Sequence, residues 1–150
     1  MARKVVESFS VEMLSILDET GKADKKLLPK LKDSQLLEMY RLMVLSRLFD
    51  RKAFALQRQG RLGTYAQHEG QEAVGIGVAF AMKKDDSLFP SFREDHILLA
   101  RGQPMENLLL YWGGDERGSV SPDGVNCFPT SIPVGRHPLH EVGVSWGEKL

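Results

Sequence analysis

The sequence predicts a helix-rich domain preceded by an extended arm. Three observations support this fold class: apolar residues recur at spacings of three and four, glycine or proline separates the helix-forming segments, and residues 113–141 are rich in both. With 150 residues, 42% of them hydrophobic, the chain can build one ordinary core. We expect an arm over residues 1–31 and one domain over residues 32–150.

The overall composition excludes several classes of protein. Twenty basic residues balance twenty acidic ones, so no net field attracts nucleic acid or an acidic membrane. No segment approaches the roughly 18–20 apolar residues that a membrane span needs. A single cysteine and an N-terminus without a signal-peptide pattern predict a cytoplasmic protein. We therefore expect neither nucleic acid nor membrane as a partner.

The arm and the first helix follow from local patterns. A short apolar segment, residues 11–17, precedes the turn-forming stretch "DETGKADKK", and neither is expected in the core. Asp33 or Ser34 then offers a capping oxygen for a helix that Gly60 ends. The positions expected to face the core are Leu36, Leu37, Tyr40, Met43, Val44 and Leu48.

A second helix is expected from Gly70 through "QEAVGIGVAFAMKK". Gly75 and Gly77 each cost up to about 1 kcal/mol relative to alanine, so close approach to a neighbour is expected there. The pair also resembles the start of a dinucleotide-binding motif, but Phe80 replaces the third glycine and no strand precedes it. We reject that interpretation, and no P-loop is present.

Two short helices and a final one complete the expected elements. The third runs from about Arg93 to Ala100, and Pro104 begins the fourth. The glycine- and proline-rich stretch that follows is expected to be irregular, and a last helix begins near Val142. Cys127 is expected to be a small buried hydrophobic residue. The histidines, which lack metal-binding spacing, are expected in solvent or behind a site: His68, His96, His137 and His140.

The segment "SFREDHILLARG" places charges at the expected start of the third helix. Glu94 and Asp95 suit that position as capping residues, because a helix N-terminus favours acids. Arg93 does not, unless an anion lies nearby, and its planar guanidinium suits a phosphate or carboxylate. An ion pair with Glu94, Asp95 or a distant acid explains it equally well. Both interpretations stay open at this level.

The ordered segments "LMVLSRLFD", "LQRQGRLGTY", "GQEAVGIGVAF", "SFREDHILLARG", "LLYWGGDERG" and "IPVGRHPLHEVGVSWGEKL" carry a family resemblance. Together they resemble the N-terminal half of the alpha subunit of the thiamine-diphosphate-dependent 2-oxo acid dehydrogenases, most of all the pyruvate dehydrogenase type. The resemblance covers about Leu31 to Leu150. It implies an α/β fold, with this chain as the helix-rich and incomplete N-terminal portion of a three-layer thiamine-diphosphate-binding fold.

The resemblance also implies roles for four residues. Arg93 would bind the cofactor diphosphate, with Phe92 lining the same site, and the backbone at Ile132 and Val134 would approach the aminopyrimidine ring. Relatives usually carry tyrosine at the position of Phe92, so one hydrogen bond worth about 0.5–1.5 kcal/mol is absent. Ala66 replaces a histidine of some pyruvate-specific relatives, and we assign no catalytic residue.

Two further departures affect the expected site. Arg136 and His137 stand where many relatives have Thr-Gln, and Glu141 replaces a small residue. The family's magnesium ligands, a "GDG" motif and an asparagine, follow the segment that this chain matches. We therefore expect half of a diphosphate site, with no metal ligand in this chain, and no activity from the chain alone.

The resemblance implies a reaction and partners. With a beta subunit in a heterotetramer, such an alpha subunit decarboxylates pyruvate on thiamine diphosphate and reductively acetylates a lipoyl group of the acyltransferase, toward acetyl-CoA. One alternative is a noncatalytic module that binds a beta subunit, and another is a branched-chain 2-oxo acid dehydrogenase subunit. A free-standing phosphate-binding protein is a third. The motifs alone leave the choice of 2-oxo acid open.

Overall fold

The computed structural model describes residues 3–150. The chain forms two compact units, and the boundary along the sequence falls between Lys32 and Asp33. The first unit is irregular and contains a turn. Asp18 Oδ1 accepts hydrogen bonds from the backbone amides of Thr20 and Lys22, both at 2.9 Å. Gly21, with φ +82, adopts the left-handed conformation that this turn requires. The expected turn is confirmed, and the apolar side chains of residues 11–17 lie outside any core, as expected.

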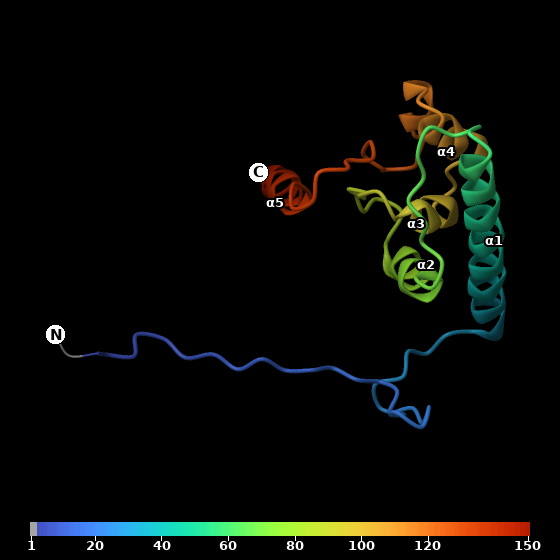
Figure 1. The fold of residues 1–150 in the computed structure, drawn as a ribbon. Helices are drawn as coiled ribbons and strands as arrows, with labels where there is room; N and C mark the ends of the chain where they lie inside the picture. Colours follow the sequence, from blue (N-terminus) through green and yellow to red (C-terminus); the bar gives the residue numbers. More distant parts are fainter. Residues whose placement is uncertain (1–2) are drawn as a thin grey trace. The chain divides into compact units, whose positions relative to one another are not determined.

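The second unit is built from helices (Figure 1). These are α1 (Asp33–Arg58), α2 (Glu72–Ala81), α3 (Asp95–Ala100), α4 (Met105–Trp112), the 3-10 helix η1 (Glu116–Ser119) and α5 (His137–Gly147). Within residues 3–150 strand pairing is limited to two isolated bridges, Leu17 with Ala23 and Leu88 with Cys127. The helix-rich expectation is confirmed, whereas the layered α/β sheet stays a prediction. None of these helices is both long and apolar enough to cross a membrane.

The core lies where α1, α2 and α3 contact one another and α4 packs beside η1. Its buried residues are Phe49, Ala53, Leu62, Leu98, Leu108 and Trp112. The predicted inner face of α1 is wrong, because Leu37 is 70% exposed and Tyr40 63% exposed. The buried face instead carries Ser46, Phe49, Asp50 and Ala53. Small and polar residues on that face accommodate hydrogen bonds to the loop that follows α1, and apolar spacing alone does not reveal this.

Glycines explain how two of the helices end and pack. Gly60 has φ +71 and terminates α1, as expected. A Cβ on Gly75 would collide with the His96 ring, so the expected close approach is confirmed there. Gly77 faces open space, so the same expectation is wrong at that position.

Two helix starts differ from the predictions. α3 begins at Asp95, after Arg93, and Glu94 is its N-cap residue without a side-chain capping bond. Asp95 is buried and its Oδ2 accepts a hydrogen bond from Trp112 Nε1 at 2.9 Å, so its expected capping role is wrong. α5 begins at His137, well before Val142, with Pro138 in the first turn, where its missing N–H costs no helical bond.

Candidate functional site

Two segments far apart in sequence run parallel and pair through their backbones. Leu88 N donates to Asn126 O at 2.9 Å, Phe128 N donates to Leu88 O at 2.8 Å, and Ser131 N donates to Pro90 O at 3.0 Å. Residues that follow paired parallel segments lie at the same edge, which is where ligands bind in open α/β sheets. The chain reaches Phe92 two residues after Pro90 and Ile132 directly after Ser131. The backbone pairing therefore places the segments that lead to Phe92 and to Ile132 side by side.

Arg93 occupies the bend before α3. Its Nη1 donates a short hydrogen bond to the carbonyl of Gln67, and its guanidinium carbon lies 5.4 Å from the centre of the Phe92 ring. The ion pair with Glu94 or Asp95, one of the two interpretations left open by the sequence, is not formed, and Glu94 accepts from the Arg93 backbone amide. α3 has six residues and starts after Arg93, so the helix N-terminus does not surround this side chain as predicted. Within residues 3–150, its positive charge has no carboxylate partner.

The second half of the site is a backbone edge. Ile132 is 52% exposed and Val134 is 83% exposed. Within the described residues, the backbone amide and carbonyl groups of these two residues form no hydrogen bond with another backbone group, so they have no protein partner. Such an edge can bind a planar ring that has both donors and acceptors, which is the role predicted for it.

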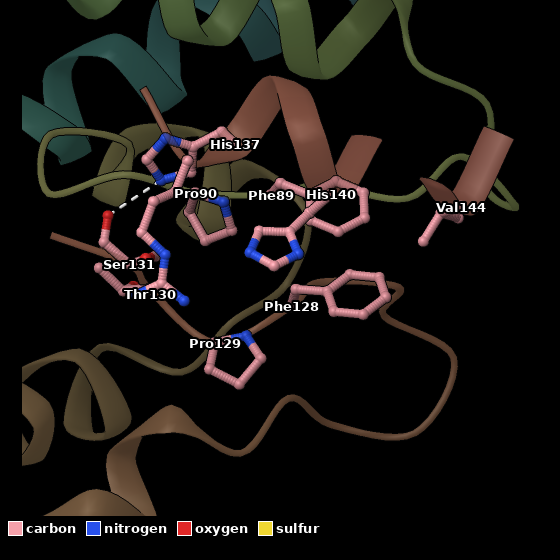
Figure 2. Close-up of a pocket in the computed structure, with 10 residues that line it drawn as sticks. Phe89, Pro90, Phe128, Pro129, Thr130, Ser131, His137, His140 and Val144 are labelled. Carbon is pink, nitrogen blue, oxygen red and sulfur yellow. Dashed lines mark hydrogen bonds between the residues drawn. The ribbon is translucent and has the colours of Figure 1, made fainter. Parts of the chain in front are cut away.

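A cleft of about 340 Å³ lies between α5 and the paired segments at residues 89–90 and 128–131 (Figure 2). The stacked rings of Phe89 and Phe128, with centroids 4.2 Å apart, form part of its wall. His137 Nε2 donates to the Ser131 carbonyl at 2.9 Å and thereby fastens the start of α5 to the loop. The lining residues are Phe89, Pro90, Phe128, Pro129, Thr130, Ser131, Arg136, His137, His140 and Val144. Two of the departures from the family pattern, Arg136 and His137, thus lie at the cleft.

His68, which follows the Gln67 that binds Arg93, belongs to a buried polar network that the sequence analysis missed. Asp50 Oδ1 accepts from the Tyr65 hydroxyl at 2.9 Å and from the His68 amide at 2.8 Å. The same oxygen lies 3.1 Å from His68 Nδ1, and His68 Nε2 lies 2.9 Å from Ser46 Oγ. The His68 ring stacks on that of His96 with centroids 4.9 Å apart. Of the two alternatives expected for these histidines, a place in solvent is wrong for both, because both are buried, and a place behind a site stays a prediction.

Burial controls the charges in this region. Together with the neighbouring His68 ring, it lowers the pKa of His96 to about 4. Burial also lowers the pKa of His68, although the Asp50 carboxylate opposes the shift. For Asp95, burial raises the pKa to about 7, against the hydrogen bond from Trp112. The two stacked imidazoles are therefore neutral near pH 7, and their charges do not repel each other.

Salt bridges also fix the loop that contains His68. Glu72 in the first turn of α2 accepts from the Gly70 amide and binds Arg47 through both carboxylate oxygens. The Arg47 guanidinium is the main cause that lowers the pKa of Glu72 to about 2, so this pair stays charged over the working range of pH. Arg51 pairs with Glu69 beside it. These contacts limit the conformations of residues 68–72.

Two other sequence expectations concern metal and cysteine. Within residues 3–150, no group of three or more His, Cys, Asp or Glu side chains is placed to hold a metal ion. Cys127 packs against the core but is only half-buried, so the expected burial is confirmed in part. Burial raises the pKa of its thiol.

Comparison with known proteins identifies the class to which this fold and site belong. The chain is a member of the dehydrogenase E1 component family, whose model matches residues 40–150. It is 46% identical over 134 residues to the pyruvate dehydrogenase E1 component subunit alpha of Acholeplasma laidlawii, an overlap that covers 89% of this chain and 39% of that subunit. The subunits of the same name from Staphylococcus epidermidis and Staphylococcus aureus are 36% identical over 139 residues, covering 92% of this chain and 38% of theirs. The chain thus spans about two fifths of the length of these relatives.

Proposed function

We propose that this chain forms the diphosphate- and ring-binding part of a pyruvate dehydrogenase alpha subunit. Arg93 binds the diphosphate of thiamine diphosphate, Phe92 lines the same site, and the backbone at Ile132 and Val134 orients the aminopyrimidine. The observation that supports the proposal is that, within residues 3–150, Arg93 has no carboxylate partner, while its segment runs beside one whose backbone groups at Ile132 and Val134 are unpaired. Both features suit an anionic cofactor with a planar ring.

The chemistry in this proposal belongs to the cofactor. When bound, thiamine diphosphate supplies the thiazolium carbon on which a 2-oxo acid loses carbon dioxide, and the protein binds and orients it. Arg93 neutralises part of the diphosphate charge, and the wall of Phe89 and Phe128 keeps the neighbouring cleft apolar. We assign no proton transfer to any described residue and no magnesium ligand to residues 3–150.

The proposal includes partners and a place of action. A beta subunit completes the site in a heterotetramer, pyruvate is the 2-oxo acid, and a lipoyl group of the acyltransferase accepts the acetyl group on the way to acetyl-CoA, in the cytoplasm. The names of the relatives described above favour pyruvate over a branched-chain substrate. A module that binds a beta subunit without thiamine diphosphate is the alternative.

Calorimetric titration of the chain mixed with a beta subunit and magnesium tests the cofactor role. We expect thiamine diphosphate to bind and Arg93→Ala to weaken binding about tenfold to a hundredfold, since a hydrogen bond to a charged group contributes about 1.5–3 kcal/mol. Arg93→Lys should fall between, because lysine lacks the bidentate geometry. Thiamine without phosphates should bind equally to the wild type and Arg93→Ala.

The control is Arg51→Ala, which removes an arginine that pairs with Glu69 on the exposed surface. This variant should bind thiamine diphosphate like the wild type. Equal affinity of the wild type and Arg93→Ala would contradict the proposed role, and a complex with the beta subunit that binds no thiamine diphosphate would support the interaction module. We expect no pyruvate turnover by the mixture, and thiamine-dependent turnover would establish that these 150 residues suffice.

A further inference from the structure

The position of Arg93 depends on a carbonyl in a different segment. Its Nη1 donates to Gln67 O, which belongs to the loop between α1 and α2. A guanidinium on a long flexible side chain loses rotamer freedom when it is fixed, so a rigid acceptor helps to hold it in one place. The rigidity of residues 65–70 therefore decides where the positive charge lies.

That loop is fixed mainly through His68, the residue next to Gln67. Its amide donates to Asp50 Oδ1, and its ring lies between Ser46 Oγ at 2.9 Å and Asp50 Oδ1 at 3.1 Å. Both partners belong to α1 and are fully buried. Nε2 is the ring nitrogen within hydrogen-bond reach of a partner, so rotation of the ring breaks its contact with Ser46 Oγ and moves Nδ1 away from Asp50 Oδ1.

His96 holds the other face of the same ring. The two imidazoles are nearly parallel, with an interplanar angle of 10°, and His96 lies on α3, three residues after Arg93. On its far side His96 meets Gly75 of α2, where even a methyl group would collide with the ring. The stack thus links the segment that carries Arg93 to the loop that carries its acceptor.

We infer that His68 and His96 are positioning residues for Arg93, holding the Gln67 carbonyl and the Arg93 backbone at a fixed separation. The benefit to cofactor affinity rests on the proposed function, whereas the effect on Arg93 itself does not. Both imidazoles act through the arginine. No described residue other than this pair stacks across the loop and α3.

The first experiment measures Arg93 directly. Exchange of the Arg93 guanidinium protons with water is followed by NMR on the full chain, with the signal assigned from Arg93→Lys. In His96→Asn and in Ser46→Ala we expect exchange to be about fivefold faster, as for one weakened hydrogen bond. Gln103→Met is the matched control, because it removes the hydrogen bonds of a different buried side chain, to Gly118 and Val120. This variant should leave the exchange of the Arg93 protons unchanged.

The second experiment is a double-mutant cycle on thiamine diphosphate affinity, in the mixture with the beta subunit. His96→Asn should weaken binding about threefold to tenfold in the wild type but less than about twofold in Arg93→Ala, because coupled residues are non-additive. A merely structural effect would give the same factor in both backgrounds.

The outcomes separate the two proposals. Unchanged Arg93 exchange in folded His96→Asn and Ser46→Ala overturns the inference, whatever the cofactor does. Ser46→Ala alone decides the question if His96→Asn does not fold, because it keeps both rings and almost all of the core volume. If thiamine diphosphate does not bind at all, the proposed function fails, and the exchange measurement still tests the positioning role.

Discussion

The two halves of the candidate site differ in how they are held. Arg93 is followed in the chain by two buried residues, Asp95 and His96, and is anchored to a loop that buried hydrogen bonds tie to α1. Ile132 and Val134 belong to an exposed segment that backbone hydrogen bonds to residues 88–90 and one histidine contact fasten. The comparison indicates that the arginine half is formed before a ligand arrives. The backbone half has few contacts of its own, so binding is expected to order it.

The largest expected difference between the halves is in amide hydrogen exchange. Amides of Asp50 and Ala53 in α1 should exchange on the order of a thousandfold more slowly than those of Phe128 and Ser131, because opening free energies rise with burial. NMR or mass spectrometry of the full chain measures both sets. Similar protection in the two halves would remove the distinction drawn here.

Removing the central acid of the arginine half should be the most damaging substitution. Asp50→Ala leaves the Tyr65 hydroxyl and the His68 amide without their buried acceptor, at a cost of about 3 kcal/mol in the free energy of unfolding. Asp123→Ala, in an exposed turn near the backbone half, should change that free energy by less than about 0.5 kcal/mol. Urea denaturation measures the free energy of unfolding of both variants. Equal losses would show that the buried network contributes no more to stability than the exposed turn does.

The pH dependence of stability should separate two opposing groups. Asp95 has its pKa raised from 3.8 to about 7 in the folded protein, so its contribution is full below pH 4 and is lost as the pH rises toward 7. His96 has its pKa lowered from 6.5 to about 4, so its contribution is full above pH 6.5 and is lost as the pH falls toward 4.

These opposite slopes predict the behaviour of Asp95→Asn. Without the acid, stability should fall more steeply between pH 6.5 and 4 than in the wild type, by up to about 1.4 kcal/mol per pH unit for one proton. Thermal unfolding of both proteins across this range measures the difference. Parallel pH profiles would mean that Asp95 is not titrating in this window.

The smallest expected effect concerns the aromatic neighbour of Arg93. Phe92→Tyr restores the hydroxyl that relatives usually carry, and we predict a gain in thiamine diphosphate affinity of about 0.5–1.5 kcal/mol, with stability nearly unchanged. Phe128→Tyr, in the cleft wall beside the other half, is the control and should leave affinity as it is. A gain for both variants would point to a general effect of added polarity.

Sequence reasoning recovered the elements but not the face that is buried. α1 and its end at Gly60 follow from spacing and from one glycine, because both are local properties. The burial of Ser46 and Asp50 was missed, since their hydrogen bonds reach a loop beyond the helix. The sequence did contain a signal for this buried face. A second and less apolar set of residues also recurs at helical spacing along α1: Ser46, Phe49, Asp50 and Ala53.

Most of the candidate site had to be inferred from the family resemblance. The residues alone left Arg93 divided between an ion pair and an anion site, because charge order along the chain does not say which groups meet in space. The structure removes the local ion pair but does not test the ligand. The pairing of residues 88–90 with 126–131 could not be predicted, since neither segment is long enough to show a strand pattern.

That parallel pairing also affects how the protein folds. The bridge between Leu88 and Cys127 encloses α3, α4 and η1, so the backbone half reaches its place only after that whole stretch has folded back. Contacts between residues so distant along the chain form slowly, because loop closure is entropically costly before any contact is gained. A ligand that touches both halves acts as a non-covalent cross-link across this loop. Its presence should therefore slow the detachment of residues 126–136 from the rest of the unit, in addition to any effect on catalysis.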